Sequence, residues 1–294
     1  IICEKLREWG VEEIDTSLCE GSVVAVINGM RPGPTVAIRG DLDCLPMPDT
    51  CGQPWQSQNP GKAHSCGHDG HATYLLGVAR YFQTYRDFPG RVVCVFQPAE
   101  EKASGAARLM ENGLVEKYDI KEIYGAHGDN KFELGTFGFK VGAMQASCDA
   151  FYLKISGHGG HGARPHLTLD PIPTTTEIVN ALQTIVSRRV DPMEPAVLSV
   201  CSINAGSYPA MNVVPNECTV SGTVRTFSVE VQDLIERKMR DIINHTAAMN
   251  ECEAEFIYRR LLGPVRNDKE ITEEAERAAC EVAGEGSTQF IDAY

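Results

Sequence analysis

The chain has 294 residues, 43% of them hydrophobic and 23% charged, so it fits one large globular domain or two ordinary ones. Its net charge of −13 argues against nucleic acid or an anionic membrane as a partner. No apolar stretch approaches the length of a membrane span, and the eleven scattered cysteines indicate a reduced, cytoplasmic protein rather than a disulfide scaffold.

The first half of the chain alternates strand patterns with helical patterns, after a helix-like segment at its start. The expected strands are 22–27, 35–39, 91–96 and 122–126, and the expected helices are 70–86 and 105–112. We expect Asn28-Gly29 and Pro32-Gly33-Pro34 to separate the first two strands. The near-continuous apolar run 91–96 is typical of a buried parallel strand. This alternation predicts an α/β sheet with helices on its faces.

A different order of elements begins near Ser147. The expected strands are 151–155, 196–203, 217–227 and 254–258, and the expected helices are 174–190 and 229–250. Their β-α-β-β-α-β order is the ferredoxin-like pattern. We therefore predict a domain of residues 147–262, inserted into a catalytic domain made of residues 1–146 and 263–294. A helical pattern resumes after Gly263-Pro264 and runs through Val282.

The densest group of chemically versatile side chains lies between His64 and His71. It contains three histidines, Cys66 and Asp69 within eight residues, between a Gly/Pro-rich loop and the start of an expected helix. Thiolate and imidazole are the standard ligands of zinc and similar metals. The alternative for this segment alone is a polar helix N-terminus with solvated histidines.

Other acid, base or ligand side chains follow the expected strands. Glu100-Glu101 follows the strand 91–96, and Asp41 and Asp43 follow the strand 35–39. His127 ends the strand 122–126. Open α/β sheets bind ligands at the carboxyl ends of their strands. An adjacent Glu pair can divide its work, because one carboxylate can bind a metal while the other acts as general base. An exposed acidic turn is the alternative for the pair taken alone.

The second half carries a glycine-rich histidine loop and two further polar candidates. Residues 156–166 hold three histidines, His161 among them, and four glycines, which allow close approach to another surface. Asn212 and Arg225 flank the third strand of this domain, and arginine suits bidentate capture of a carboxylate. A flexible loop and ordinary surface residues are the alternatives.

These segments together resemble the amidohydrolase branch of the zinc aminopeptidase/aminoacylase superfamily. That branch includes hippurate hydrolases, N-acyl-amino-acid amidohydrolases and plant auxin-conjugate hydrolases. The motifs that carry the resemblance stand in the family's order and spacing at residues 41–46, 64–71, 96–101, 157–166, 212–215 and 222–227. The resemblance implies a metallopeptidase-like α/β catalytic domain with a mostly parallel sheet, and an inserted ferredoxin-like α+β domain through which two subunits form a homodimer.

The resemblance also implies a role for each matched residue. Up to two divalent metals, zinc or manganese, would be bound by Cys66, His68, Glu101 and His127. Glu100 matches the general base, and Asp43 matches the acidic residue that orients a ligand. His161 would reach the partner subunit's active site and stabilise the transition state, while Asn212 and Arg225 would hold the substrate carboxylate. The implied reaction is hydrolysis of the amide bond of an N-acyl amino acid, which releases a carboxylic acid and an amino acid.

Some features depart from the family pattern and leave alternatives open. Lys102-Ala103-Ser104 replaces a glycine run, and the family's last ligand, a histidine near its C-terminus, has no counterpart, since the last histidine here is His245. Either the chain lacks its ends, or it is a degraded relative that serves as a binding or dimerisation module. A dipeptidase or aminopeptidase of the superfamily is the other alternative. Those enzymes have His-x-Asp where this chain has Asp41-Leu42-Asp43, and Asp where it has Cys66.

Overall fold

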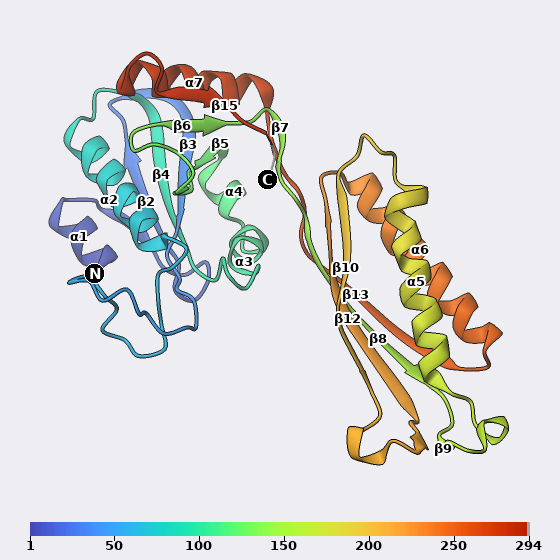
Figure 1. Cartoon of the computed structure of the whole chain (residues 1–294). Coiled ribbons are helices and arrows are strands. Elements are labelled where there is room, and N and C mark those ends of the chain that lie inside the picture. Colours follow the sequence, from blue (N-terminus) through green and yellow to red (C-terminus); the bar gives the residue numbers. More distant parts are fainter. Residues whose placement is uncertain (293–294) are drawn as a thin grey trace. The chain divides into compact units, whose positions relative to one another are not determined.

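The computed structural model describes residues 1–292 and divides into two compact units. The first unit comprises Ile1–Glu133, and the second begins at Leu134 (Figure 1). The second unit contains the whole predicted insertion, 147–262, together with the segments that flank it on both sides. The predicted assignment of those flanking segments to a catalytic domain stays a prediction.

The first unit is built on a five-stranded sheet in the order β1-β2-β4-β3-β5. The strands are β1 Glu13–Asp15, β2 Val23–Asn28, β3 Arg31–Asp41, β4 Pro89–Gln97 and β5 Ile120–Gly125. β3 pairs parallel with β4 and with β5, whereas β2 pairs antiparallel with β1 and with β4. The predicted α/β sheet is therefore confirmed, with its parallel part around β3.

Helices cover both faces of this sheet (Figure 1). They are α1 Ile2–Glu8, α2 His68–Thr84, α3 Gly105–Glu111 and α4 Leu114–Tyr118. Successive side chains of a strand point to opposite faces. Cys94 and Phe96 of β4 accordingly pack with α1 and α2, whereas Val93 and Val95 pack with α3 and α4. Burial of both faces explains why β4 is apolar almost throughout.

The expected break at Pro32-Gly33-Pro34 is wrong, because β3 already begins at Arg31. The pairing with β4 shifts register between Arg31 and Thr35, so the prolines lie where the ladder is irregular. A Cβ on Gly33 would stand 2.7 Å from the backbone nitrogen of Gly90. Glycine is required here because the start of β4 packs directly against this backbone.

The second unit contains a four-stranded antiparallel sheet in the order β10-β12-β8-β13. Its elements run β8 Cys148–Ser156, α5 Pro171–Arg189, β10 Ala196–Ala205, β12 Glu217–Thr226, α6 Val229–Met249 and β13 Glu253–Leu262. The predicted β-α-β-β-α-β pattern is thus confirmed. α5 and α6 pack on one face of the sheet over a continuous apolar core (Figure 1). Short elements lie in the connections, namely β9 Gly160–His161, η1 Pro165–Leu167, η2 Tyr208–Ala210 and β11 Val213–Val214.

The flanking segments of the second unit pair with each other. They form β6 Phe137–Phe139, β7 Gly142–Gln145, β14 Val265–Asn267, α7 Lys269–Ala283 and β15 Thr288–Phe290. β7 pairs antiparallel with β14, and β6 pairs parallel with β15. The helix predicted after Gly263-Pro264 is present as α7, but the short strand β14 precedes it. None of the helices in residues 1–292 combines the length and apolar composition that crossing a membrane requires.

Candidate metal centre

The ends of three strands and the start of one helix bring the candidate side chains of the first unit together. Asp43 follows β3, Glu100 and Glu101 follow β4, and His127 follows β5. α2 begins at His68, directly after Gly67, whose φ of 87° lies in the left-handed region that favours glycine. This turn lets the chain present Cys66 just before the helix and His68 in its first turn. Because parallel strands end at a common edge, the four segments converge there.

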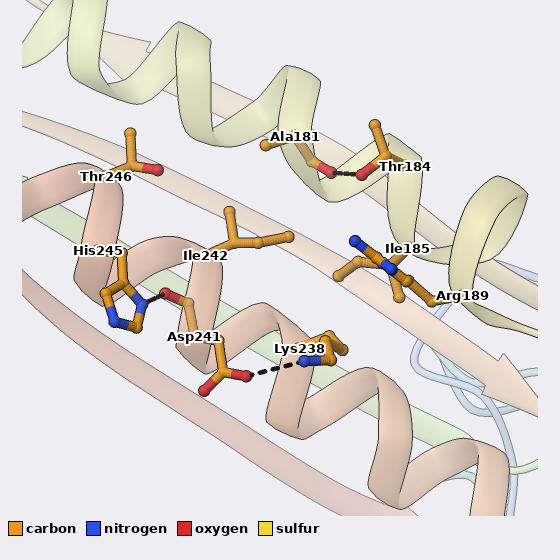
Figure 2. A pocket seen from close by; sticks show the side chains of 9 residues that line it. All are labelled: Ala181, Thr184, Ile185, Arg189, Lys238, Asp241, Ile242, His245 and Thr246. Atoms are coloured by element: carbon orange, nitrogen blue, oxygen red, sulfur yellow. Dashed lines mark hydrogen bonds and ion pairs between the residues drawn. The ribbon is translucent and has the colours of Figure 1, made fainter.

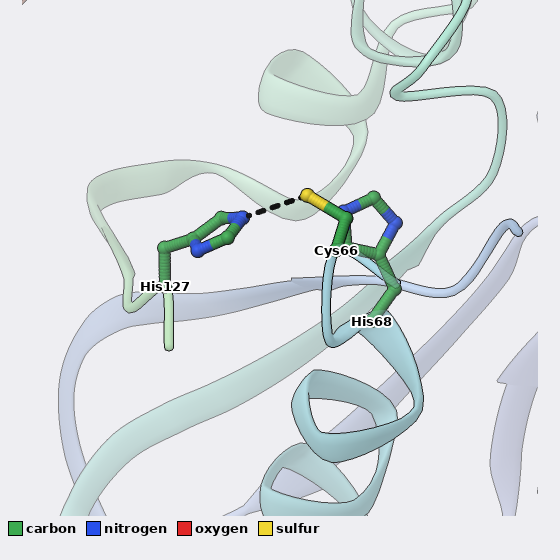
Figure 3. Close-up of side chains that lie close together, drawn as sticks. All are labelled: Cys66, His68 and His127. Carbon is green, nitrogen blue, oxygen red and sulfur yellow. Dashed lines mark hydrogen bonds between the residues drawn. The ribbon is translucent and has the colours of Figure 1, made fainter. Parts of the chain in front are cut away.

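Three groups of metal-compatible side chains share His68, and two of them contain the predicted ligands. Single donor atoms of Cys66, His68 and His127 all lie within 4.8 Å of one another, and so do those of His68, Glu100 and Glu101. The Cys66 thiol points at the His127 ring, with Sγ 3.4 Å from Nε2 (Figure 3). His68 Nε2 lies 4.0 Å from Glu100 Oε2 and 3.9 Å from Glu101 Oε1. The thiol, two imidazoles and two carboxylates therefore surround one small volume.

Asp43 sets the orientation of His68. Nδ1 of His68 lies 3.1 Å from the backbone oxygen of Asp43 and 3.3 Å from its Oδ1. The other carboxylate oxygen of Asp43 accepts a hydrogen bond of 3.2 Å from the backbone N–H of Glu101. Engaging Nδ1 leaves Nε2 of His68 as the nitrogen that faces Glu100 and Glu101. Asp43 thus contacts the segments of two predicted ligands at once.

Buried polar atoms without a hydrogen-bond partner mark the same place. In residues 1–292 they include Asp41 Oδ2, Asp43 Oδ1 and His68 Nε2, although Asp41 Oδ2 forms an ion pair with Arg39. A buried polar atom left unsatisfied costs about 1–3 kcal/mol. The donor set of thiolate, imidazole and carboxylate is the one preferred by borderline divalent metals. The residues present therefore fit a divalent cation, which would satisfy Nε2 of His68.

The pKa shifts of Glu100 and Cys66 also favour a bound divalent cation. Burial raises the pKa of Glu100, and the neighbouring charges of Asp41 and Glu101 raise it further. Burial also raises the pKa of the Cys66 thiol to about 11, with Glu101 as the next largest cause. Both shifts express an excess of negative charge in a partly buried space. A divalent cation would offset that charge and favour the thiolate.

Asp41 and His71 also belong to this centre, although the sequence motifs predict no role for either residue. Asp41 is fully buried, and His71 is 3% exposed. Oδ1 of Asp41 accepts a hydrogen bond of 2.5 Å from His71 Nδ1, and Oδ2 lies 2.8 Å from an Arg39 guanidinium nitrogen. Burial alone would raise the pKa of Asp41, but His71 and Arg39 outweigh it and hold that pKa below its usual value. The usable sequence signal was the helical spacing, since His71 lies three residues after His68 on one helix face.

The second unit brings two of its three candidates together. His161 in β9 pairs with Val213 in β11, and the backbone N–H of Gly162 donates to the carbonyl of Asn212 at 2.8 Å. This short ladder extends the β8–β12 pairing beyond Glu217. Arg225 lies near the opposite end of β12, eight residues after Glu217. At about 3.3 Å per residue, Arg225 is roughly 25 Å from Glu217, and His161 and Asn212 lie beyond Glu217.

A pocket also opens between α5 and α6 of this unit (Figure 2). Lys238 and Asp241 on its wall form an ion pair of 3.2 Å, and His245 Nδ1 donates to the backbone oxygen of Asp241. The side-chain groups that could hold a metal, among residues 1–292, all belong to the first unit and none lines this pocket.

Comparison with known proteins identifies the family. Peptidase family M20/M25/M40 matches residues 37–292. The chain belongs to this family. The chain is 36% identical to an N-acetylcysteine deacetylase of Bacillus subtilis over 281 residues, which cover 94% of this chain and 73% of the relative. It is also 36% identical to a hippurate hydrolase of Campylobacter jejuni over 296 residues, covering 99% of this chain and 75% of that one.

A solved M20 structure has the same fold. The YXEP protein of Bacillus subtilis, described as a dinuclear metal binding peptidase from the M20 family, superimposes with a TM-score of 0.85 at 32% identity. The match covers all of this chain and 75% of that protein. The predicted amidohydrolase branch and the prediction of an enzyme that acts on amide bonds are confirmed by these relatives.

Proposed function

We propose that this M20 protein hydrolyses the amide bond of an N-acyl amino acid at a divalent metal centre. Cys66, His68, Glu101 and His127 would hold the metal. The observation that carries the proposal is the buried Nε2 of His68, which has no hydrogen-bond partner and faces three carboxylates, at 3.6–4.0 Å, beside the Cys66 thiol. The solved relative described as dinuclear, at 32% identity, supports up to two metals. Zinc and manganese suit this mixed donor set.

The chemistry divides between the metal and the protein. A divalent metal polarises the amide carbonyl and lowers the pKa of water, which is how metal sites overcome the resistance of amides to hydrolysis. Glu100 takes the proton of the attacking water and delivers it to the leaving amine. Asp43 keeps His68 in the orientation that directs Nε2 to the metal.

The substrate class follows from the relatives and from two polar residues. An N-acetylcysteine deacetylase and a hippurate hydrolase, at 36% identity each, both remove an acyl group from an amino acid. Their acyl groups differ in size, so an N-acyl amino acid is the class they share. Asn212 and Arg225 would bind the carboxylate of the amino acid, with Arg225 suited to bidentate contact.

We further propose that the protein is a homodimer in which His161 serves the active site of the partner subunit. Residues 147–262 would form the contact, because the exposed edge strand β10 can pair with its symmetry mate in an isologous interface. The separation along β12 supports this arrangement. Asn212 and Arg225, more than roughly 25 Å apart, cannot hold one carboxylate within one subunit, but they can serve the two sites of a dimer.

The test combines metal analysis with a matched hydrolysis screen. Purified protein is assayed with N-acetyl and N-benzoyl amino acids and, as controls, with dipeptides that carry a free amino group. We expect bound divalent metal and turnover of the acylated substrates only. Turnover of the dipeptides alone would replace the proposal by a peptidase. Absence of both metal and turnover would replace it by a binding or dimerisation module.

A further inference from the structure

A buried chain of hydrogen bonds runs from β3 through α2 to the loop that carries His127. It begins at Asp41, whose Oδ1 accepts the 2.5 Å hydrogen bond from His71 Nδ1. On the opposite side of the same ring, Nε2 of His71 accepts a hydrogen bond of 2.9 Å from the backbone N–H of Gly128. The carbonyl of Gly128 in turn lies 2.7 Å from Nδ1 of His127. Gly128 therefore links the two imidazoles through its own backbone groups.

We propose that His71 is a positioning residue for His127, and that it acts through Gly128. The inference rests on the proposed metal centre, in which His127 is a ligand. His71 itself points its two nitrogens at Asp41 and Gly128, so both are engaged within the protein. Its task is to fix where His127 lies and which nitrogen His127 offers.

The direction of each hydrogen bond determines the tautomers. Gly128 N–H can only donate, so Nε2 of His71 carries no proton, and the proton of the neutral ring lies on Nδ1, where Asp41 accepts it. The carbonyl of Gly128 can only accept, so His127 carries its proton on Nδ1. Nε2 of His127 is left with its lone pair, 3.4 Å from Cys66 Sγ. That is the nitrogen a metal beside Cys66 would use.

His127 needs this support because of where it lies. Residues 126–129 follow β5 without regular secondary structure, and His127 is exposed. By contrast, Asp41, at the other end of this series of hydrogen bonds, is firmly held, because it is fully buried and its Oδ2 pairs with Arg39. Arg39 Nε also donates to Gln97 at the end of β4 with a bond of 2.8 Å. The network thus anchors an exposed ligand to the buried ends of two strands.

A second contact from α2 holds the residue before His127 but not the ring itself. The Tyr74 hydroxyl oxygen lies 2.8 Å from the carbonyl oxygen of Arg39 and 3.1 Å from that of Ala126, and its single proton can be donated to either. Tyr74 follows His71 by three residues and lies on the same face of α2. Of these two contacts from α2, the one through Gly128 reaches both the backbone after His127 and, by its carbonyl, the His127 ring. His71 is for this reason the residue to test.

The experiment measures the affinity of the metal-free protein for cobalt(II), followed by the near-ultraviolet absorption of a cobalt–thiolate bond. Loss of an outer partner of a metal ligand typically costs 10–100-fold in affinity. We expect a fall of about that size in His71→Ala. His71→Gln should lose less, because its side-chain oxygen can still accept from Gly128. Thr73→Ala is the matched control on the same helix, since Thr73 is exposed and bonds only within α2.

A double-mutant cycle separates positioning of His127 from an effect through His68, whose ring centre lies 5.5 Å from that of His71. Since the ring centres of His71 and His127 are also 4.5 Å apart, the smaller loss in His71→Gln separates the contact through Gly128 from direct packing of the two rings. In a His127→Ala background, His71→Ala should change cobalt affinity by less than about twofold. An equal fall in both backgrounds would show that His71 acts elsewhere and would overturn the proposal. So would unchanged affinity of His71→Ala in the otherwise native protein.

Two further measurements distinguish failure of the fold, of the metal centre and of the role of His71. Thermal unfolding of each metal-free variant checks the fold, and if His71→Ala does not fold, His71→Gln is compared in both backgrounds instead. If the unsubstituted protein binds no cobalt, the proposed metal centre fails and the role of His71 fails with it. If it binds cobalt and the cycle shows no coupling, only the role of His71 is lost.

Discussion

Replacing Glu100 by Gln should lower turnover strongly without removing the metal. The substitution keeps the shape of the side chain and removes its ability to take a proton. General base catalysis contributes about 10²–10⁴-fold, so turnover should fall by that factor, equivalent to about 3–5 kcal/mol of transition-state stabilisation. Glu101 is the predicted ligand of the pair. Of the charged groups that raise the pKa of the Cys66 thiol, Glu101 has the largest effect.

The same structure predicts the sign of the effect on stability. The pKa of Glu100 is raised by burial and by the charges of Asp41 and Glu101, so the folded metal-free protein disfavours its ionised form. A raised carboxyl pKa means that stability is lost as the pH rises through that pKa. At neutral pH, Glu100→Gln removes this unfavourable charge. The metal-free variant should therefore unfold at the same temperature as the native protein or at a higher one.

The assay pairs Glu100→Gln with Glu101→Gln, the same chemical change at the adjacent position. Each purified variant is measured for metal content, kcat and KM with an N-acyl amino acid that the native protein turns over. Glu100→Gln should keep its metal and lose kcat, whereas Glu101→Gln should lose metal. Near-native turnover of Glu100→Gln, or loss of metal from it with retention in Glu101→Gln, would refute the division of roles.

Three more predictions concern the ligand set, the dimer and acid stability. Cys66→Ala should remove at least one metal, as checked by metal analysis; unchanged content would mean the site is misassigned. Mixing inactive His161→Ala with inactive Glu100→Gln under subunit exchange should partly restore activity, because a mixed dimer contains one site with neither defect; no recovery, or a monomer in light scattering, would exclude action in trans. Burial would raise the pKa of Asp15, but hydrogen bonds led by Lys117 outweigh it and hold that pKa well below the usual value of 3.8. The stability from Asp15 is therefore present above about pH 4 and lost as the pH falls towards its folded pKa, so Asp15→Asn should flatten the loss of thermal stability between about pH 2 and 5. If Asp15→Asn loses as much thermal stability as the native protein between about pH 2 and 5, this prediction is wrong.

Local pattern was enough to predict most elements of both units. A near-continuous apolar run identified β4, and the helical spacing of apolar residues identified α6, because both patterns are properties of neighbouring residues along the chain. The same holds for the β-α-β-β-α-β order of the second unit. The break expected at Pro32-Gly33-Pro34 failed because Gly33 is required by a contact with Gly90, more than fifty residues later, which local pattern does not contain.

The candidate site shows the same division. The sequence by itself determined which side chains follow each strand or stand at the start of α2, and hence that Cys66, His68, Glu100, Glu101 and His127 would meet at one edge of a sheet. The contacts of Asp41 and His71 were decided only in the folded chain, where burial forces each polar atom to find a partner across 30 residues or more. Tertiary structure alone likewise separated Asn212 from Arg225, because the length of β12 sets their distance and thirteen positions in sequence do not. The motifs in the sequence show which side chains are present, whereas the distance between them in the folded protein depends on strand length and packing.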